Sequence, residues 1–121
     1  MARTALIVDD SATIRMMVSF TLKRAGFGVL EACDGQEGLE RLDAARVDVI
    51  VTDLNMPRLD GISFIRSLRS RPASRYTPVV MMTTESQQSK RQEGRAAGAS
   101  AWMVKPFEPD KLLAVIAKVV P

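Results

Sequence analysis

The chain of 121 residues contains no histidine at all. Without imidazole it cannot build a Ser-His-Asp or Cys-His catalytic site, an imidazole zinc site or a phosphohistidine of its own. It has one cysteine, Cys33, which excludes an internal disulfide and a cysteine-based metal cage. We expect Cys33 to be a small, semi-buried residue that follows a strand. Any step that needs a histidine must therefore rely on a partner protein.

Aromatic residues and long apolar runs are also scarce. Aromatics make up 5% of the chain, while the apolar share of 46% and the charged share of 26% are ordinary for a folded globular protein. No apolar stretch approaches the length of a bilayer, and the N-terminus lacks the layout of a signal peptide. We therefore expect a single cytoplasmic domain over residues 1–121, with no membrane association.

A net charge of +3 and an isoelectric point near 9.4 raise the question of nucleic-acid binding. The densest basic patch has only Tyr76 as a neighbouring aromatic and carries no recognition-helix pattern. We therefore expect no binding to DNA. We interpret the patch as a solvated face and loop, with electrostatic steering of a partner as the alternative; its members are Arg66, Arg69, Arg71 and Arg75.

Short apolar runs alternate with segments of helical spacing along the chain. Strands are predicted at 5–8, 28–32, 47–52, 79–83 and 101–104, and helices at 11–25, 35–45, 62–70, 85–97 and from 109 onwards. Five such alternations with short connections predict a parallel sheet covered by helices on both faces, with right-handed crossovers. Glu31 places the second strand at an edge. The helix over 85–97 offers the core only alanines and contains Gly94, so it should be the least firmly anchored.

Polar side chains follow four of the predicted strands, at the point where each strand ends. Asp9 and Asp10 follow the first, Asp53 the third, Thr83 closes the fourth and Lys105 follows the fifth. In an open parallel sheet these ends form the ligand-binding edge. Clustered carboxylates repel one another unless a cation intervenes, and an all-oxygen site favours Mg²⁺, with Mn²⁺ as the alternative, over Zn²⁺. A lysine and a hydroxyl nearby suit a phosphoryl group.

Each of these residues also has a simpler interpretation. Asp10 could cap a helix, Asp53 could be a turn residue, and Lys105 could be a surface charge. Thr83 could be a β-branched residue at a strand end. Taken singly, the simpler role would be preferred for each of them. Their joint occurrence at four strand ends favours the metal and phosphoryl site.

The motifs at these strand ends resemble the receiver domain of bacterial two-component response regulators, in particular the single-domain, CheY-like chemotaxis type. The resemblance covers the whole chain and implies a doubly wound, flavodoxin-like α/β fold with five parallel strands in the order 2-1-3-4-5 and five helices. The segments that carry it are Ile7-Val8-Asp9-Asp10-Ser11, Thr52-Asp53-Leu54-Asn55-Met56-Pro57, Asp60-Gly61, Met82-Thr83-Thr84-Glu85, Gly98-Ala99 and Lys105-Pro106-Phe107.

The resemblance implies a phosphoacceptor signalling protein that assists its own phosphorylation and dephosphorylation, rather than an enzyme. Asp53 would take a phosphoryl group from a phosphohistidine on a sensor kinase or a histidine phosphotransferase. Asp10 and Asp53 would bind Mg²⁺ with the main-chain carbonyl of Asn55, and Asp9 would act largely through water. Lys105 would pair with Asp53 or its phosphoryl oxygens.

Switching is implied by the same resemblance. Thr83 would hydrogen-bond the phosphoryl group and move, and Trp102 would turn inward; the alternative is that Trp102 is a fixed surface aromatic on an edge strand. Asn55 and Glu85 lie two residues after Asp53 and Thr83, where family members tune hydrolysis, and they match fast-cycling regulators. We therefore expect a monomeric protein whose phosphorylated form is short-lived. It would act on a downstream protein such as a flagellar motor switch.

Four other functions compete with this one. A flavodoxin would share the fold, but Asp9-Asp10 would repel its cofactor's phosphate. An Mg²⁺-dependent aspartate phosphohydrolase usually has a second acid where this chain has Asn55. A non-catalytic interaction module would not need the complete set of acids. Finally, the receiver could act in a phosphorelay or in feedback on a kinase or phosphotransferase.

Overall fold

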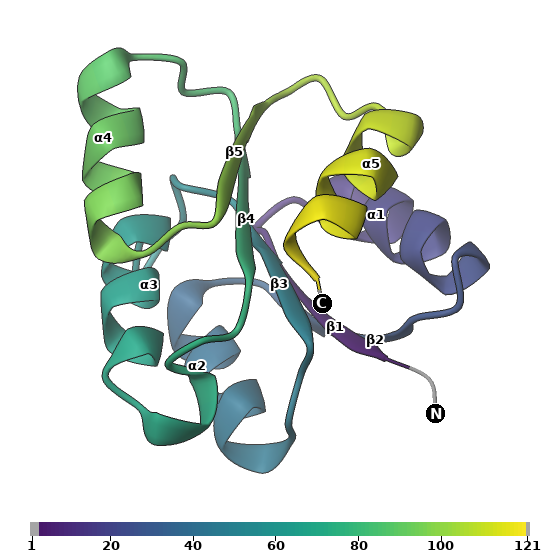
Figure 1. Cartoon of the computed structure of the whole chain (residues 1–121), viewed down its shortest axis with the longest axis horizontal. Helices are drawn as coiled ribbons and strands as arrows, with labels where there is room; N and C mark the ends of the chain where they lie inside the picture. Colours follow the sequence, from purple (N-terminus) through teal and green to yellow (C-terminus); the bar gives the residue numbers. More distant parts are fainter. Residues whose placement is uncertain (1–2, 121) are drawn as a thin grey trace.

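The computed structural model describes residues 3–120, in which five strands alternate with five α-helices (Figure 1). The elements are β1 (Thr4–Val8), α1 (Ala12–Arg24), β2 (Gly28–Ala32), α2 (Gly35–Ala44), β3 (Val49–Thr52), α3 (Gly61–Arg69), a 3₁₀ turn (Pro72–Ser74), β4 (Val79–Thr83), α4 (Gln88–Ala97), β5 (Ala101–Val104) and α5 (Pro109–Val119). The predicted succession of elements is confirmed.

The strands form one parallel sheet in the order β2-β1-β3-β4-β5, as predicted. Figure 1 shows α2, α3 and α4 on one face of the sheet and α1 and α5 on the other. The chain reverses its direction of winding between β1 and β3, which are neighbours in the sheet. Ligands bind at the carboxyl ends of the strands beside such a reversal.

Side chains of the inner strands alternate between two apolar cores. In β1, Leu6 and Val8 pack toward α2 and α3, whereas Ala5 and Ile7 pack toward α1 and α5. Both sets are fully buried, so uniform apolar runs rather than alternating ones are what this sheet requires. Phe64 of α3 fills the first core, and a Cβ on Gly38 would lie 2.9 Å from its ring.

Most element boundaries fall within two residues of the prediction, but α4 starts three residues late. The prediction began this helix at Glu85, and it begins at Gln88. The backbone of Glu85 is already engaged in non-helical contacts, since its N–H donates to Thr83 Oγ1 and its carbonyl accepts from Trp102. In a helix that began at Glu85 this carbonyl would accept from the N–H of Ser89, and here it accepts from the indole instead.

Two predictions about burial are wrong. Cys33 is exposed, because the chain leaves β2 for the cap of α2 at this point. The helical spacing of Met17 with Val18, Thr21 and Leu22 predicts that all four face inward, but Met17 is 41% exposed while the other three are buried.

The arginine patch is only in part a solvated face. Arg66 and Arg75 are exposed, as expected. Arg71 instead pairs with Asp43 of α2. Arg69 is partly buried, and its guanidinium donates to the main-chain carbonyls of Ser74, Arg75, Thr77 and Gly98. These four hydrogen bonds hold the end of α3 against the loops before β4 and β5. The sequence pattern could not separate structural arginines from solvated ones.

Within residues 3–120, no helix combines the length and the apolar character that a membrane-spanning segment needs.

Candidate metal and phosphoryl site

The hydrogen bonding of the parallel sheet places four polar residues at one edge, namely Asp9, Asp53, Thr83 and Lys105. The N–H of Asp9 donates to Ala32 of β2, the N–H of Asp53 to Val8 of β1, and the N–H of Lys105 to Thr83 of β4. Each residue thus continues the hydrogen bonding of its strand by one position. The strand ends are therefore in register, and their side chains leave the sheet at the same edge.

Three carboxylates gather at this edge, as predicted. One oxygen each from Asp9, Asp10 and Asp53 lies within 4.8 Å of the others. Asp9 and Asp53 are buried and Asp10 is exposed, so the cluster opens to solvent on one side. Hard divalent cations such as Mg²⁺ take carboxylate oxygens of this kind while keeping several of their own waters. The donor set therefore fits Mg²⁺.

Lys105 supplies the positive charge of the cluster. Its Nζ lies 3.0 Å from Asp9 Oδ2 and 3.2 Å from Asp53 Oδ2. Burial alone would lower the pKa of this ammonium group, but the two carboxylates outweigh burial and raise the pKa above its usual value. Lys105 is thus a permanent cation in contact with both buried acids.

Asp9 is held by backbone and side-chain groups that sequence reasoning did not assign. Its Oδ1 accepts from the N–H of Ser11 at 2.9 Å, and its carbonyl accepts from Arg15 Nη1 at 2.6 Å. Burial raises the pKa of Asp9, although Ser11 and Lys105 act in the opposite direction. A carboxyl whose charge is costly to bury gains from any cation brought beside it.

The loop after β3 fixes Asp53 from the other side. Its Oδ1 accepts from the N–H of Leu54 at 2.7 Å. Gly61, the first residue of α3, donates to the Leu54 carbonyl at 2.7 Å, and a Cβ added to Gly61 would lie only 2.2 Å from the carbonyl oxygen of Asp53. The sequence contained the Asp60-Gly61 pair but gave no sign of this close approach.

Thr83, Glu85 and Trp102 form a second group next to the acid cluster. Thr83 is fully buried at the end of β4, and its Oγ1 accepts from the N–H of Glu85 at 3.2 Å. Trp102 Nε1 donates to the carbonyl of Glu85 at 3.1 Å. Trp102, on the edge strand β5, is half-buried against α4. Asn55 is exposed, two residues after Asp53.

Known proteins share this arrangement. The family model for the response regulator receiver domain matches residues 5–117. The chain is 40% identical to the chemotaxis protein CheY1 of Helicobacter pylori over 109 residues, 88% of each chain. The structure of CheY4 of Vibrio cholerae has a TM-score of 0.95 with this one at 45% identity, over 99% of this chain and 100% of that one.

A third structure bears on the metal. It is the receiver domain of the sensor histidine kinase PA1611 of Pseudomonas aeruginosa, which has a magnesium ion coordinated in its active site cleft. It has a TM-score of 0.90 and 25% identity, over 98% of both chains. With the order of its strands, its acid cluster and a family match over nearly its full length, this chain belongs to the response regulator receiver domain family.

Proposed function

We propose that the protein accepts a phosphoryl group on Asp53 from a phosphohistidine in an Mg²⁺-dependent reaction. The observation that supports this most is the contact of one lysine with two buried acids, Lys105 Nζ at 3.0 Å from Asp9 and 3.2 Å from Asp53. Such a cluster costs free energy to assemble and contributes little to stability, which is typical of a functional site.

In the transfer, a carboxylate oxygen of Asp53 attacks phosphorus and the bond from phosphorus to the histidine nitrogen breaks, with the electron pair and a proton ending on the imidazole. Asp53 is aimed by the Leu54 N–H, and Lys105 balances the charge on the phosphoryl oxygens. Asp9, Asp10, Asp53 and the Asn55 carbonyl would hold Mg²⁺, which supplies further charge neutralisation. The hydroxyl of Thr83 would donate a hydrogen bond to an oxygen of the transferred group.

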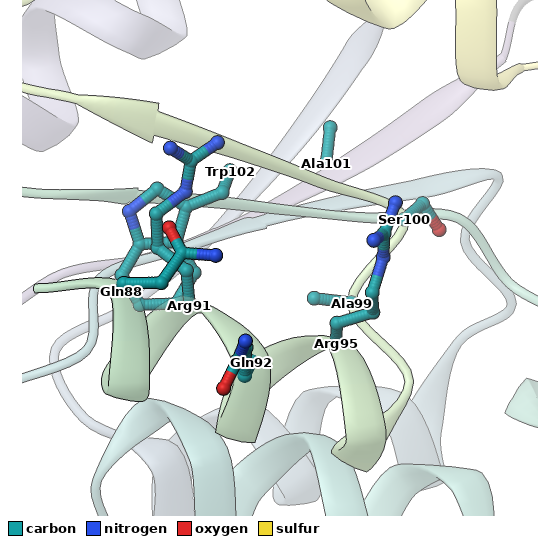
Figure 2. A pocket seen from close by; sticks show the side chains of 8 residues that line it. All are labelled: Gln88, Arg91, Gln92, Arg95, Ala99, Ser100, Ala101 and Trp102. Carbon is teal, nitrogen blue, oxygen red and sulfur yellow. The ribbon is translucent and has the colours of Figure 1, made fainter. Parts of the chain in front are cut away.

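The downstream partner would bind to the face made by α4 and β5. A pocket of about 340 Å³ lies there, lined among others by Gln88, Arg91, Arg95 and Trp102 (Figure 2). Two exposed arginines favour a partner segment with acidic side chains. We further propose that the protein is a cytoplasmic monomer that acts in chemotaxis on a downstream protein such as the flagellar motor switch. Its likeness to the chemotaxis proteins CheY1 and CheY4 supports the role in chemotaxis.

Phosphorylation is tested by incubation with Mg²⁺ and acetyl phosphate followed by intact-mass measurement. The native chain should gain one phosphoryl group, Asp53→Asn should gain none, and the carboxylate control Asp110→Asn should behave as the native chain. Absence of an adduct with acetyl phosphate and with a phosphorylated histidine kinase would leave the non-catalytic interaction module as the better account.

The lifetime of the phosphoryl group is a separate measurement. Asn55 and Glu85 are the residues we propose to set it, and with this pair the phosphoprotein should be short-lived. A phosphorylated form that persists for hours in Mg²⁺ buffer would contradict this part of the proposal.

A further inference from the structure

Trp102 lies against α4 at the position where this helix has a glycine. A Cβ added to Gly94 would lie 2.8 Å from Cζ3 of Trp102 and 3.2 Å from Cε3. Both atoms belong to a rigid aromatic ring, which cannot fold aside as the end of a flexible side chain would. Among the described residues of α4, Gly94 alone is buried, and it is the indole that covers it. The indole fits here because Gly94 has no side chain.

The other end of the indole is fixed by a hydrogen bond. Nε1 donates to the carbonyl of Glu85 at 3.1 Å, and the N–H of the same residue donates to Thr83 Oγ1 at 3.2 Å. Two consecutive hydrogen bonds thus connect the indole of Trp102, which packs against α4, with the Thr83 hydroxyl at the end of β4. Because Thr83 Oγ1 accepts from Glu85, its own hydrogen remains available as a donor.

We propose that Gly94 is a positioning residue for the phosphoryl site. By seating Trp102 it holds the backbone of Glu85 in place, and this backbone orients the hydroxyl of Thr83 so that its hydrogen can bond the phosphoryl group. The inference rests on the function proposed for Asp53 and Thr83. It adds a residue outside the acid cluster that controls how well the cluster binds its phosphoryl group.

Substitution of Gly94 by alanine has two effects that must be separated. Alanine favours helix over glycine, so the intrinsic preference of α4 improves. The added methyl group, however, must displace the indole and so lengthen the hydrogen bond from Trp102 Nε1 to the carbonyl of Glu85. If Gly94 acts through the ring, Gly94→Ala should weaken binding of a phosphoryl analogue in the native background. The same substitution should have no effect on this binding once Trp102 has been replaced by alanine.

The packing of the Trp102 ring against Gly94, which we call the seat, is tested on the metal-free protein without phosphorylation. Trp102 is the only tryptophan, so its fluorescence quenching by acrylamide reports its exposure directly. Gly94→Ala should raise the quenching constant, because the displaced ring moves from a half-buried toward an exposed position. The control Ala96→Gly changes the helix preference of α4 at an exposed position and should leave quenching unchanged. Unchanged quenching in Gly94→Ala would overturn the seat.

The connection to the site is tested by titration with beryllofluoride in Mg²⁺, followed by ¹⁹F NMR so that variants without tryptophan can be measured. Gly94→Ala should raise the midpoint roughly threefold or more in the native background and leave it nearly constant in Trp102→Ala. Equal shifts in both backgrounds would overturn the connection. Absence of beryllofluoride binding by the native chain would refute the proposed function and the connection with it, while the quenching result would still decide the seat.

Discussion

Gly61 decides whether the loop after β3 can close against Asp53. A Cβ at this position would lie 2.2 Å from the Asp53 carbonyl oxygen and 2.9 Å from Leu54 Cα, and both are backbone atoms that cannot rotate away. Gly61→Ala should therefore shift the loop, lower the free energy of unfolding by about 2 to 3 kcal/mol and slow phosphorylation of Asp53. Urea unfolding and the rate of adduct formation with acetyl phosphate measure the two effects.

Gly28 provides the matched control for this substitution. A Cβ there would meet its nearest neighbour, Thr4 Oγ1, at 3.7 Å, an ordinary contact. Gly28→Ala should change stability by less than about 0.5 kcal/mol and leave phosphorylation unchanged. If Gly61→Ala proved as mild as Gly28→Ala, the close approach would not constrain the site.

Lys105 places one positive charge beside two buried acids, and its removal should leave both acids without a compensating charge. Lys105→Met keeps the unbranched, apolar stem of the side chain but removes the charge beside Asp9 and Asp53. We expect the free energy of unfolding in EDTA to fall by about 3 kcal/mol, the cost typical of breaking a buried ion pair from one side. Addition of Mg²⁺ should restore part of this loss, because a second cation can take the place of the first.

Lys111 serves as the exposed comparison. Its ion pair with Glu108 has a similar distance, 3.2 Å, but both side chains are exposed. Lys111→Met should therefore change stability by less than about 1 kcal/mol, with or without Mg²⁺. Equal losses in the two variants would mean that burial of the acid cluster does not set the energetics of Lys105.

Among the elements, α4 is the helix held by the fewest buried side chains. It buries Gly94 alone among its described residues, whereas α3 buries Gly61, Ile62, Phe64, Ile65 and Leu68. We expect the amide hydrogens of Arg91–Ala97 to exchange faster than those of the interior of α3, by roughly tenfold or more. Hydrogen exchange followed by NMR measures this, and equal protection in the two helices would contradict the prediction.

The type and order of the elements could be predicted because apolar runs and helical spacing alternate clearly. What the sequence could not predict were contacts between residues distant in the chain. The start of α4 depends on the bonds of Glu85 to Thr83 and Trp102, the latter 17 residues away. The role of Arg69 depends on the carbonyl of Gly98, which lies 29 residues away. Local patterns carry no information about such partners.

The acid cluster could be predicted for a different reason. In a parallel sheet, all strands end at the same edge, so Asp9, Asp53 and Lys105 are brought together by topology although Lys105 is 96 residues from Asp9. The supports of the cluster were missed for two reasons. Ser11 acts through its main-chain N–H, which residues of any type except proline possess, and Gly61 acts by having no side chain. The readable pattern consisted of polar side chains at strand ends, which include the uncharged Thr83 as well as the charged residues.

The folded domain as a unit creates the acid cluster, since the unfolded chain has no reason to hold Asp9, Asp10 and Asp53 within 4.8 Å of one another. Mg²⁺ should therefore bind the folded state and stabilise it, by about 2.7 kcal/mol at a free concentration near one hundred times Kd. Thermal unfolding in EDTA and in rising MgCl₂ measures the gain. Asp53→Asn should lose most of the gain, and NaCl at equal ionic strength should produce none of it. If NaCl raised the melting temperature as much as MgCl₂ does, general screening of three repelling carboxylates would explain the effect, and no specific site would be needed.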